Sequence, residues 1–187
     1  MIVPFKLTYF VYDDGDFISF LACFGSIIPA FLFGAALYQG FLKFDLKYLR
    51  TAAILLLNTM LNGIIKDVLK GERVASSGRD LCVNEGYGMP SDHAQFMFCW
   101  LAIFIYDLGT HRLAKSSVSQ KPFFAFMYHN LLYVGSIGLS LFVCYSRYYL
   151  GCHSVLQLFI GAIIGLLIGI VTIIVGSKIS SKKIKYQ

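Results

Sequence analysis

Five runs of apolar residues, each long enough to cross a lipid bilayer, dominate the sequence. They cover about residues 17–40, 47–69, 91–108, 123–145 and 153–176. A helix that spans a bilayer needs roughly 17 to 25 residues. Hydrophobic residues make up 57% of the 187 positions and charged residues 14%, which is more apolar surface than a soluble domain of this length can bury. We therefore predict an all-α fold, a polytopic membrane bundle of about five helices that forms one domain over 1–187.

Charged residues predict how the bundle lies in the membrane. One set of segments, the 41–46 and 109–122 connections and the 177–187 tail with their flanking helix ends, holds ten basic and two acidic residues, whereas the other side holds six basic and eight acidic ones. By the positive-inside rule the first side is cytoplasmic, so segment 1–16 is predicted to be lumenal or external. The net charge of +6 is then explained by topology, and we expect membrane lipids rather than nucleic acid as partners.

Polar residues suited to phosphate chemistry collect on the predicted non-cytoplasmic side. They are Lys66, Arg73, Ser91, His93, Arg147 and His153. Cations stabilise the charge on phosphoryl oxygens, and two imidazoles can divide nucleophilic attack from proton transfer. The histidines stand near predicted helix N-termini, where backbone N–H groups favour an anion.

Each of these residues also has an ordinary structural explanation. Lys66 and Arg73 could extend to lipid headgroups, Ser91 could cap a helix, and Arg147 could anchor a helix end. These explanations do not account for the spacing of the residues or for their convergence on one membrane face. The sequence leaves open whether Cys82 and Cys152, on that same face, are bonded.

Three ordered motifs resemble the type 2 phosphatidic acid phosphatase superfamily. They are Lys66-x6-Arg73, Pro90-Ser91-Asp92-His93, and Ser146-Arg147-x5-His153. The resemblance implies that His153 is the nucleophile that forms a phosphohistidine and that His93 protonates the leaving group. It also implies that Lys66, Arg73, Ser91 and Arg147 hold the phosphoryl oxygens, and that the reaction needs no metal and no cofactor.

Three positions depart from the superfamily pattern. Val74 stands where a proline follows the arginine, Asp92 replaces a small residue, and Gln157 replaces the aspartate that orients the nucleophile. Gln157 lies one helical turn after His153, so its amide oxygen can still accept an imidazole N–H. Asp92 adds negative charge beside the phosphate and is expected to point away, towards Lys70 or Arg79, or to cap its helix.

The glutamine and the segment Tyr87–Met97 are similar to the dolichyl-diphosphatase branch of the superfamily. This similarity implies that dolichyl diphosphate is hydrolysed to dolichyl phosphate at the lumenal face of the endoplasmic reticulum, which recycles the carrier for protein N-glycosylation. The basic sequence Lys183–Gln187 resembles a retrieval signal. A groove lined by Phe96, Phe98, Tyr148 and Tyr149 is predicted to hold the polyprenyl chain. The alternatives left open are a phosphatase for phosphatidate or undecaprenyl diphosphate, an inactive lipid-binding or scaffold protein, and, less favoured, a transporter.

Overall fold

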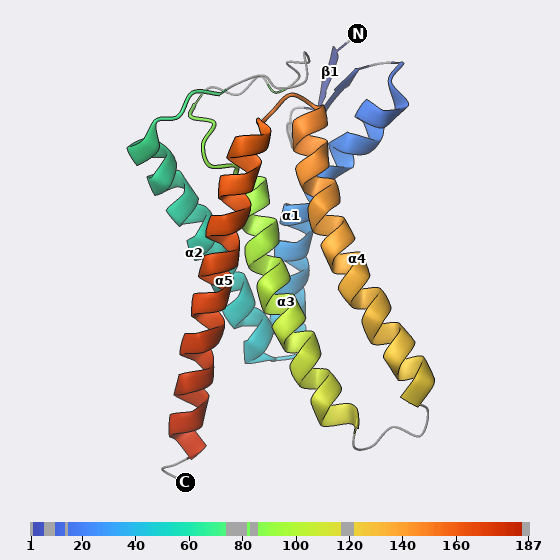
Figure 1. Cartoon of the computed structure of the whole chain (residues 1–187), viewed down its shortest axis with the longest axis vertical. Coiled ribbons are helices and arrows are strands. Elements are labelled where there is room, and N and C mark those ends of the chain that lie inside the picture. The colour runs from blue at the N-terminus through green and yellow to red at the C-terminus, as the bar shows by residue number, and fades with distance from the viewer. Residues whose placement is uncertain are drawn as a thin grey trace.

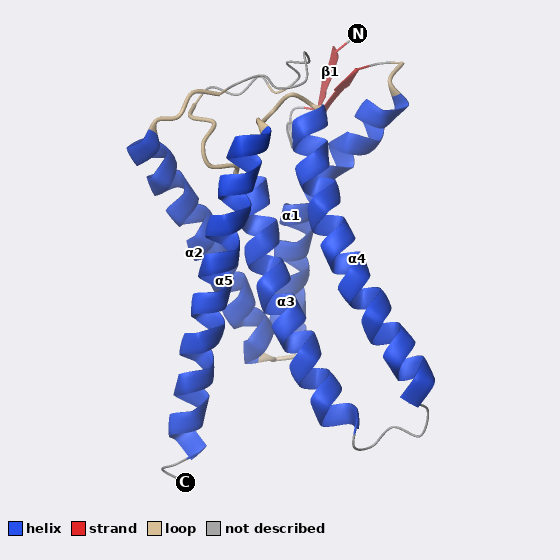
Figure 2. Ribbon diagram, viewed as in Figure 1, coloured by secondary structure: helices blue, strands red, loops and turns tan. Residues whose placement is uncertain are grey.

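The computed structural model of the chain is a bundle of five long helices with a short β-hairpin at its N-terminus (Figures 1 and 2). The structure describes residues 2–5, 10–13, 15–73, 82, 86–116 and 122–184. The helices are α1 (Phe17–Leu42), α2 (Leu46–Leu69), α3 (Asp92–Ser116), α4 (Pro122–Tyr149) and α5 (Val155–Ile184). The strands β1 (Ile2–Phe5) and β2 (Phe10–Asp13) are antiparallel, with Ile2 opposite Asp13.

The five predicted helices are confirmed, but their ends differ from the predicted ones. α3 continues to Ser116 and α5 to Ile184, because helical hydrogen bonding extends past the apolar core into charged turns. α5 begins at Val155, so the prediction that His153 opens this helix is wrong. The hairpin was not predicted. Val74, Arg79 and the last three residues of the retrieval-like sequence lie outside the described residues.

The two ends of the bundle differ in the segments they carry. We call "site end" the one where α2 and α4 end and α3 and α5 begin, and "basic end" the one with the α1–α2 turn and the end of α5 (Figure 1). At the site end, Asp16 caps α1 by accepting hydrogen bonds from the backbone N–H groups of Ile18 and Ser19. The Tyr149 hydroxyl donates to the same carboxylate at 2.8 Å, which ties the end of α4 to the start of α1.

α3 is the central helix of the bundle and packs most extensively on α5. Ala94, Met97 and Cys99 are fully buried, and Ile103 is nearly so. Among the described residues, α1, α2, α4 and α5 are long and apolar enough to cross a membrane by themselves, whereas α3 falls outside this group. Its neighbours explain the difference, since a helix surrounded by other helices can carry polar side chains that lipid would exclude.

Three glycines on α5 allow α3 to approach closely. Gly161, Gly165 and Gly169 are spaced four residues apart, and a Cβ atom added at any of them would lie 3.0 Å or less from an atom of α3 or of Ser91, which directly precedes α3. Small residues at this spacing let helix backbones pack in van der Waals contact within a membrane. The contact fixes the start of α3 against the start of α5, which is where Ser91 and Gln157 meet.

Candidate active site

The turn between α4 and α5 is held by the backbone of Arg147. Its carbonyl accepts the N–H groups of Cys152 at 2.9 Å and of His153 at 3.3 Å, and Gly151 adopts a positive φ of 73°. These bonds tie the position of the His153 backbone to the end of α4. The Arg147 side chain and the His153 side chain are therefore presented together at the site end.

Ser154 and Gln157 form a reciprocal cap at the start of α5. The Gln157 N–H donates to Ser154 Oγ at 3.3 Å, and the Ser154 N–H donates to Gln157 Oε1 at 3.2 Å. Such a capping box satisfies two N–H groups that the first helical turn leaves without partners. It also holds the Gln157 side chain beside the residue that precedes the cap.

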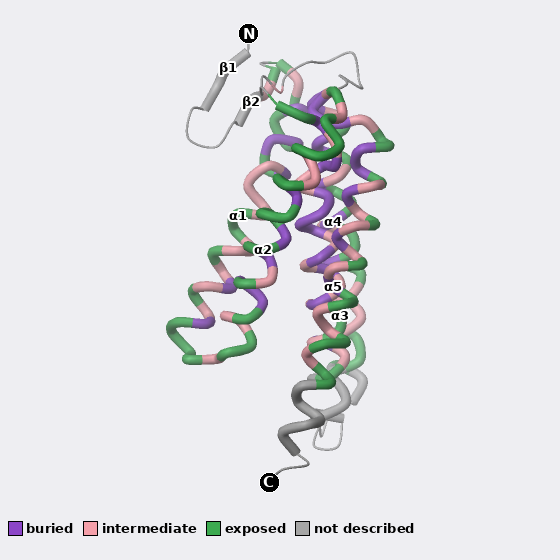
Figure 3. The backbone as a smooth tube through the Cα atoms, turned by 90° about the vertical axis from the view of Figure 1, so that its left-hand side faces the viewer, coloured by how far each residue is buried: buried purple, intermediate pink, exposed green. Residues whose placement is uncertain are grey.

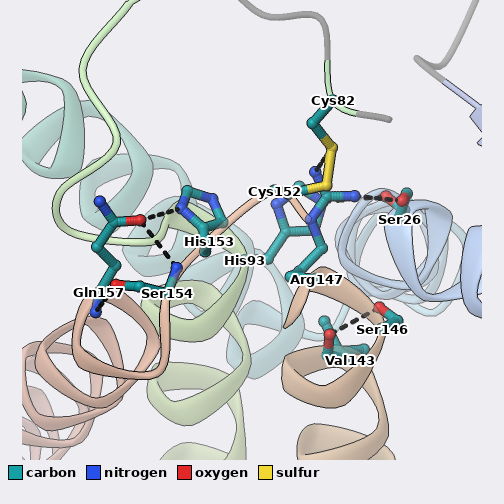
Figure 4. The surroundings of a disulfide bond; sticks show 10 residues. All are labelled: Ser26, Cys82, His93, Val143, Ser146, Arg147, Cys152, His153, Ser154 and Gln157. Carbon is teal, nitrogen blue, oxygen red and sulfur yellow. Dashed lines mark hydrogen bonds between the residues drawn. A yellow bond between two sulfur atoms is a disulfide. The ribbon is translucent and has the colours of Figure 1, made fainter. Parts of the chain in front are cut away.

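That neighbouring residue is His153, and Gln157 orients its ring (Figure 4). The His153 Nδ1 lies 3.3 Å from Gln157 Oε1. An amide oxygen only accepts hydrogen bonds, so Nδ1 carries the proton and Nε2 carries the in-plane lone pair of a neutral imidazole. The residue is 3% exposed, and this bond fixes the direction of its ring and of the Nε2 lone pair.

Gln157 has a second partner that an aspartate could not have. Its Nε2 donates to the Glu72 carbonyl at 2.9 Å, in the segment that follows α2 and immediately precedes Arg73. One amide therefore connects the His153 ring with the backbone that carries Arg73. Gly88 completes the contact, because a Cβ atom there would lie 2.8 Å from both Arg73 Cα and Gln157 Nε2.

Burial and nearby cations keep His153 neutral. Burial lowers the pKa of His153 most, and the positive charges of Arg147 and Arg73 lower it further, to about 3, although the Gln157 hydrogen bond acts in the opposite direction. An imidazole attacks only in its neutral form. Attack should therefore be lost on acidification only near pH 3, rather than near the ordinary value of about 6.5.

We expect the rate of phosphoenzyme formation not to fall between pH 7 and pH 5, because His153 stays neutral over this range. A nucleophile with an ordinary pKa would lose about 25-fold over this range. The measurement is rapid mixing with substrate labelled in its terminal phosphate, followed by an alkaline detergent quench, with substrate titration followed separately by phosphorus NMR. A 25-fold fall that remains after correction for the substrate would contradict the depressed pKa.

Arg147 is held on two sides and is 5% exposed. Its Nη1 donates to Ser26 Oγ of α1, and its Nη2 donates to Cys82 Sγ at 3.3 Å. The buried Nε has no hydrogen-bond partner within the described part of the chain. The guanidinium is thus fixed in place while one of its donors remains available to an anion.

Ser91 and His93 approach the same place from the start of α3. Ser91 is fully buried, caps α3 through Oγ at 3.5 Å from the Ala94 nitrogen, and donates its backbone N–H to the Gln157 carbonyl at 3.1 Å. The His93 Nε2 lies 3.3 Å from the Ser26 carbonyl, so Nε2 is the protonated nitrogen and Nδ1 is left for proton exchange. The positive charge of Arg147 acts on His93.

Lys66 and Asp92 are two further charged residues of the candidate site. Lys66 lies in the last turn of α2 and interacts electrostatically with Asp92, Arg73 and Arg147. The cations that act on the Asp92 carboxylate are Lys66 and Arg147. Arg79, one of the two partners expected for Asp92, lies outside the described residues, and the expected turn towards Lys70 stays a prediction. Asp92 offsets part of the positive charge of the site.

A disulfide bond braces the site from the loop side (Figure 4). Cys82 and Cys152 are bonded, with their Cα atoms 5.0 Å apart. Cys152 directly precedes His153, and Cys82 Sγ accepts the Arg147 hydrogen bond. The bridge thus contacts Arg147 and adjoins His153, and it settles the bonding of these two cysteines that the sequence had left open.

Reduction of this disulfide is expected to lower kcat by roughly 10-fold, since small displacements of reacting groups are costly. The measurement is phosphate release after treatment with a phosphine reductant, with the thiol state read by alkylation and mass spectrometry. Cys23, Cys99 and Cys144 carry thiols, and a variant with all three replaced by alanine should respond in the same way. Unchanged kcat in protein shown to be reduced at Cys82 and Cys152 would refute the bracing role.

Two predicted groove residues make contacts that stabilise the fold. Phe96 is 6% exposed and belongs to the main hydrophobic core, whereas Tyr149 bonds Asp16. The prediction that Phe96 lines a polyprenyl groove is therefore wrong, whereas the same prediction for Phe98, Tyr148 and Tyr149 is untested. Ser26, which contacts both Arg147 and His93, could not be recognised from the sequence, because its neighbours are those of an ordinary apolar span. Gly88, by contrast, could have been recognised from the glycine-rich segment that precedes Pro90.

The structure thus brings all seven predicted site residues to the site end of one membrane bundle, in an arrangement suited to a membrane-embedded phosphotransfer enzyme. The sequence matches the PAP2 superfamily over residues 47–180, a range that contains all seven. The chain belongs to the PAP2 superfamily, and the predicted resemblance is confirmed.

Several known proteins are similar to the chain. Dolichyldiphosphatase of Saccharomyces cerevisiae is 33% identical, over 90% of this chain and 68% of that protein. Dolichyldiphosphatase 1 of Mus musculus is 29% identical, over 94% and 72% respectively. The crystal structure of a transmembrane PAP2-type phosphatidylglycerolphosphate phosphatase from Bacillus subtilis has a similar fold, with a TM-score of 0.64 at 20% identity over 85% of this chain and 74% of that one.

Proposed function

We propose that the chain is a dolichyldiphosphatase that hydrolyses dolichyl diphosphate to dolichyl phosphate and inorganic phosphate. The observation that carries the proposal is the orientation of His153 by Gln157 next to Arg147. Similarity to the dolichyldiphosphatases of yeast and mouse supports the choice of substrate. A diphosphate at a lipid headgroup would reach a site placed, like this one, at the ends of spanning helices.

The first chemical step is attack by His153 Nε2 on the terminal phosphorus. The bond from that phosphorus to the bridging oxygen breaks, and His93 gives a proton to the departing dolichyl phosphate. Lys66, Arg73, Ser91 and Arg147 hold the oxygens of the transferred group, where preorganised cations stabilise the transition state most effectively.

The second step releases phosphate from the histidine. Water attacks the phosphohistidine and gives a proton to His93, which restores the acid for the next turnover. The phosphorus–nitrogen bond breaks and returns a neutral His153. The Gln157 amide keeps the ring in position throughout, and no step requires a metal or another cofactor.

Gln157→Asp is expected to lower kcat by roughly 10-fold, although it restores the superfamily's aspartate. The shorter carboxylate can still accept from the His153 Nδ1 but has no N–H for the Glu72 carbonyl. Phosphate release and melting temperature would be measured beside Gln157→Glu, which preserves chain length. If both variants matched the wild type, the bond to Glu72 would be irrelevant to catalysis.

We place the active site on the lumenal face of the endoplasmic reticulum membrane, where dolichyl diphosphate would arise during N-glycosylation. The charge distribution of the connecting segments supports this orientation. The Cys82–Cys152 disulfide at the site end supports it independently, because such bonds persist in oxidising compartments.

One experiment tests the proposal against its rivals. Protein purified in detergent is given dolichyl diphosphate, dolichyl phosphate or phosphatidate, each with and without EDTA, and phosphate release is measured. We expect EDTA-insensitive release that is fastest from the diphosphate. Faster release from phosphatidate would indicate a general lipid phosphatase, and release from none of the three would indicate a scaffold in which Asp92 blocks phosphate binding.

A further inference from the structure

A cavity of about 720 Å³ lies at the basic end, on the opposite side of the bundle from the active site. It is lined by residues of the α1–α2 turn, the start of α2, α3 and α4, and in Figure 3 the α1–α2 turn stands apart from α3 and α5. Its volume falls within the range of about 300 to 1,000 Å³ that is usual for small-ligand sites. The proposed hydrolysis uses none of its residues.

Opposite charges surround the cavity in equal number. Lys43 follows the last turn of α1 and Lys47 lies in the first turn of α2, and both are exposed. Asp45 and Asp107 are the acidic residues of the lining. Asp45 caps α2 by accepting the Lys47 N–H at 2.9 Å. The charge-complementary ligand is therefore one that carries both a negative and a positive group.

The turn that presents the two lysines exposes large apolar side chains. Phe44 has a positive φ of 50°, an uncommon conformation for a bulky residue that persists where the surrounding structure requires it. Phe44 is 89% exposed and Leu46 is 77% exposed. Apolar side chains directed outwards from a turn between two spanning helices place the mouth of the cavity near the depth of lipid headgroups.

The inner wall combines apolar side chains with a polar atom that has no partner. Phe104, Leu108 and Leu132 supply apolar surface. The Nδ1 of His129 is buried and has no hydrogen-bond partner within the described part of the chain. The ring itself packs edge-on against Tyr128, with centroids 5.9 Å apart. Buried polar atoms are normally satisfied, so a ligand oxygen or hydroxyl near His129 would complete this wall.

We propose that this cavity binds a zwitterionic glycerophospholipid, one whose headgroup carries a phosphate and an ammonium. Lys43 and Lys47 hold the phosphate, Asp107 attracts the ammonium, and the glycerol end of the acyl chains contacts Phe104 and Leu108. Basic pockets between helices at a membrane surface are known to hold lipid headgroups. The equal number of acidic groups here favours a zwitterion over an anionic lipid.

Native mass spectrometry of the full-length protein tests this site. Protein in detergent micelles is incubated with phosphatidylethanolamine, phosphatidylglycerol or inorganic phosphate, and the molecules that remain bound to each protein are counted. We expect one phosphatidylethanolamine, retained at least 5-fold more than phosphatidylglycerol, and no retained phosphate. The double variant Lys43→Gln/Lys47→Gln should retain at least 5-fold less phosphatidylethanolamine than the wild type. Asp107→Asn should shift the preference towards phosphatidylglycerol.

Lys178→Gln is the matched control. It removes an exposed lysine of α5 near the basic end of the bundle, and this lysine does not line the cavity. Melting temperature shows whether each variant folds, and the two single lysine variants replace the double one if it does not. Equal lipid retention by the lysine variants and Lys178→Gln would overturn the proposal. So would a wild-type preference for phosphatidylglycerol, or retention of inorganic phosphate as strong as that of the lipid.

Discussion

His153→Ala is expected to reduce phosphate release from dolichyl diphosphate by 10³-fold or more, on the order seen when a covalent nucleophile is removed. The reason is geometric as well as chemical. The imidazole is directed by Gln157 at 3.3 Å and kept neutral by its surroundings, and alanine offers no group that could take its place. KM is expected to change much less, because the phosphate-holding residues remain.

A labelling experiment distinguishes loss of the nucleophile from loss of the fold. Wild-type protein mixed with substrate labelled in the terminal phosphate should acquire label that is stable to alkali and labile to acid, as expected of phosphohistidine. His93→Ala should retain that label longer, since water attack lacks its base, and His153→Gln should acquire none. His111→Ala, near the opposite end of α3, is the control and should behave as wild type. Label on His153→Gln would exclude His153 as the nucleophile.

Arg147→Lys is expected to lower kcat/KM by about 10²-fold even though it preserves the positive charge. The arginine reaches Ser26 and Cys82 at the same time through two nitrogens, and a single ammonium cannot reproduce this forked geometry. The side chain is also 5% exposed. A misplaced ammonium there would no longer meet the transferred phosphoryl group.

Two comparisons make the Arg147 result interpretable. Ser26→Ala removes one of the two supports and should cost only several-fold, because the guanidinium remains with one support. Arg50→Lys, an exposed position on α2 near the basic end, should be without effect on kcat/KM. Melting temperatures would be recorded for all three variants. A conservative Arg147→Lys variant with full activity would mean that charge alone, without the fork, satisfies the phosphate.

The sequence by itself determined the number of long helices and the position of every predicted site residue along the chain. A lipid environment forces long uninterrupted apolar runs, and such runs can be recognised locally. The superfamily motifs are equally local, since Lys66 and Arg73, Ser91 and His93, and Arg147 and His153 are each separated by only a few residues. Even the bond from His153 to Gln157 follows from one helical turn of spacing.

Only the tertiary structure decided how these local pieces meet. The Ser26 contacts with Arg147 and His93, the Cys82–Cys152 bridge and the Gln157 bond to Glu72 join residues that lie far apart in the sequence. The central place of α3, and with it the burial of Phe96, depends on three glycines of another helix. Such contacts follow from the packing of whole helices against one another, which no local pattern encodes.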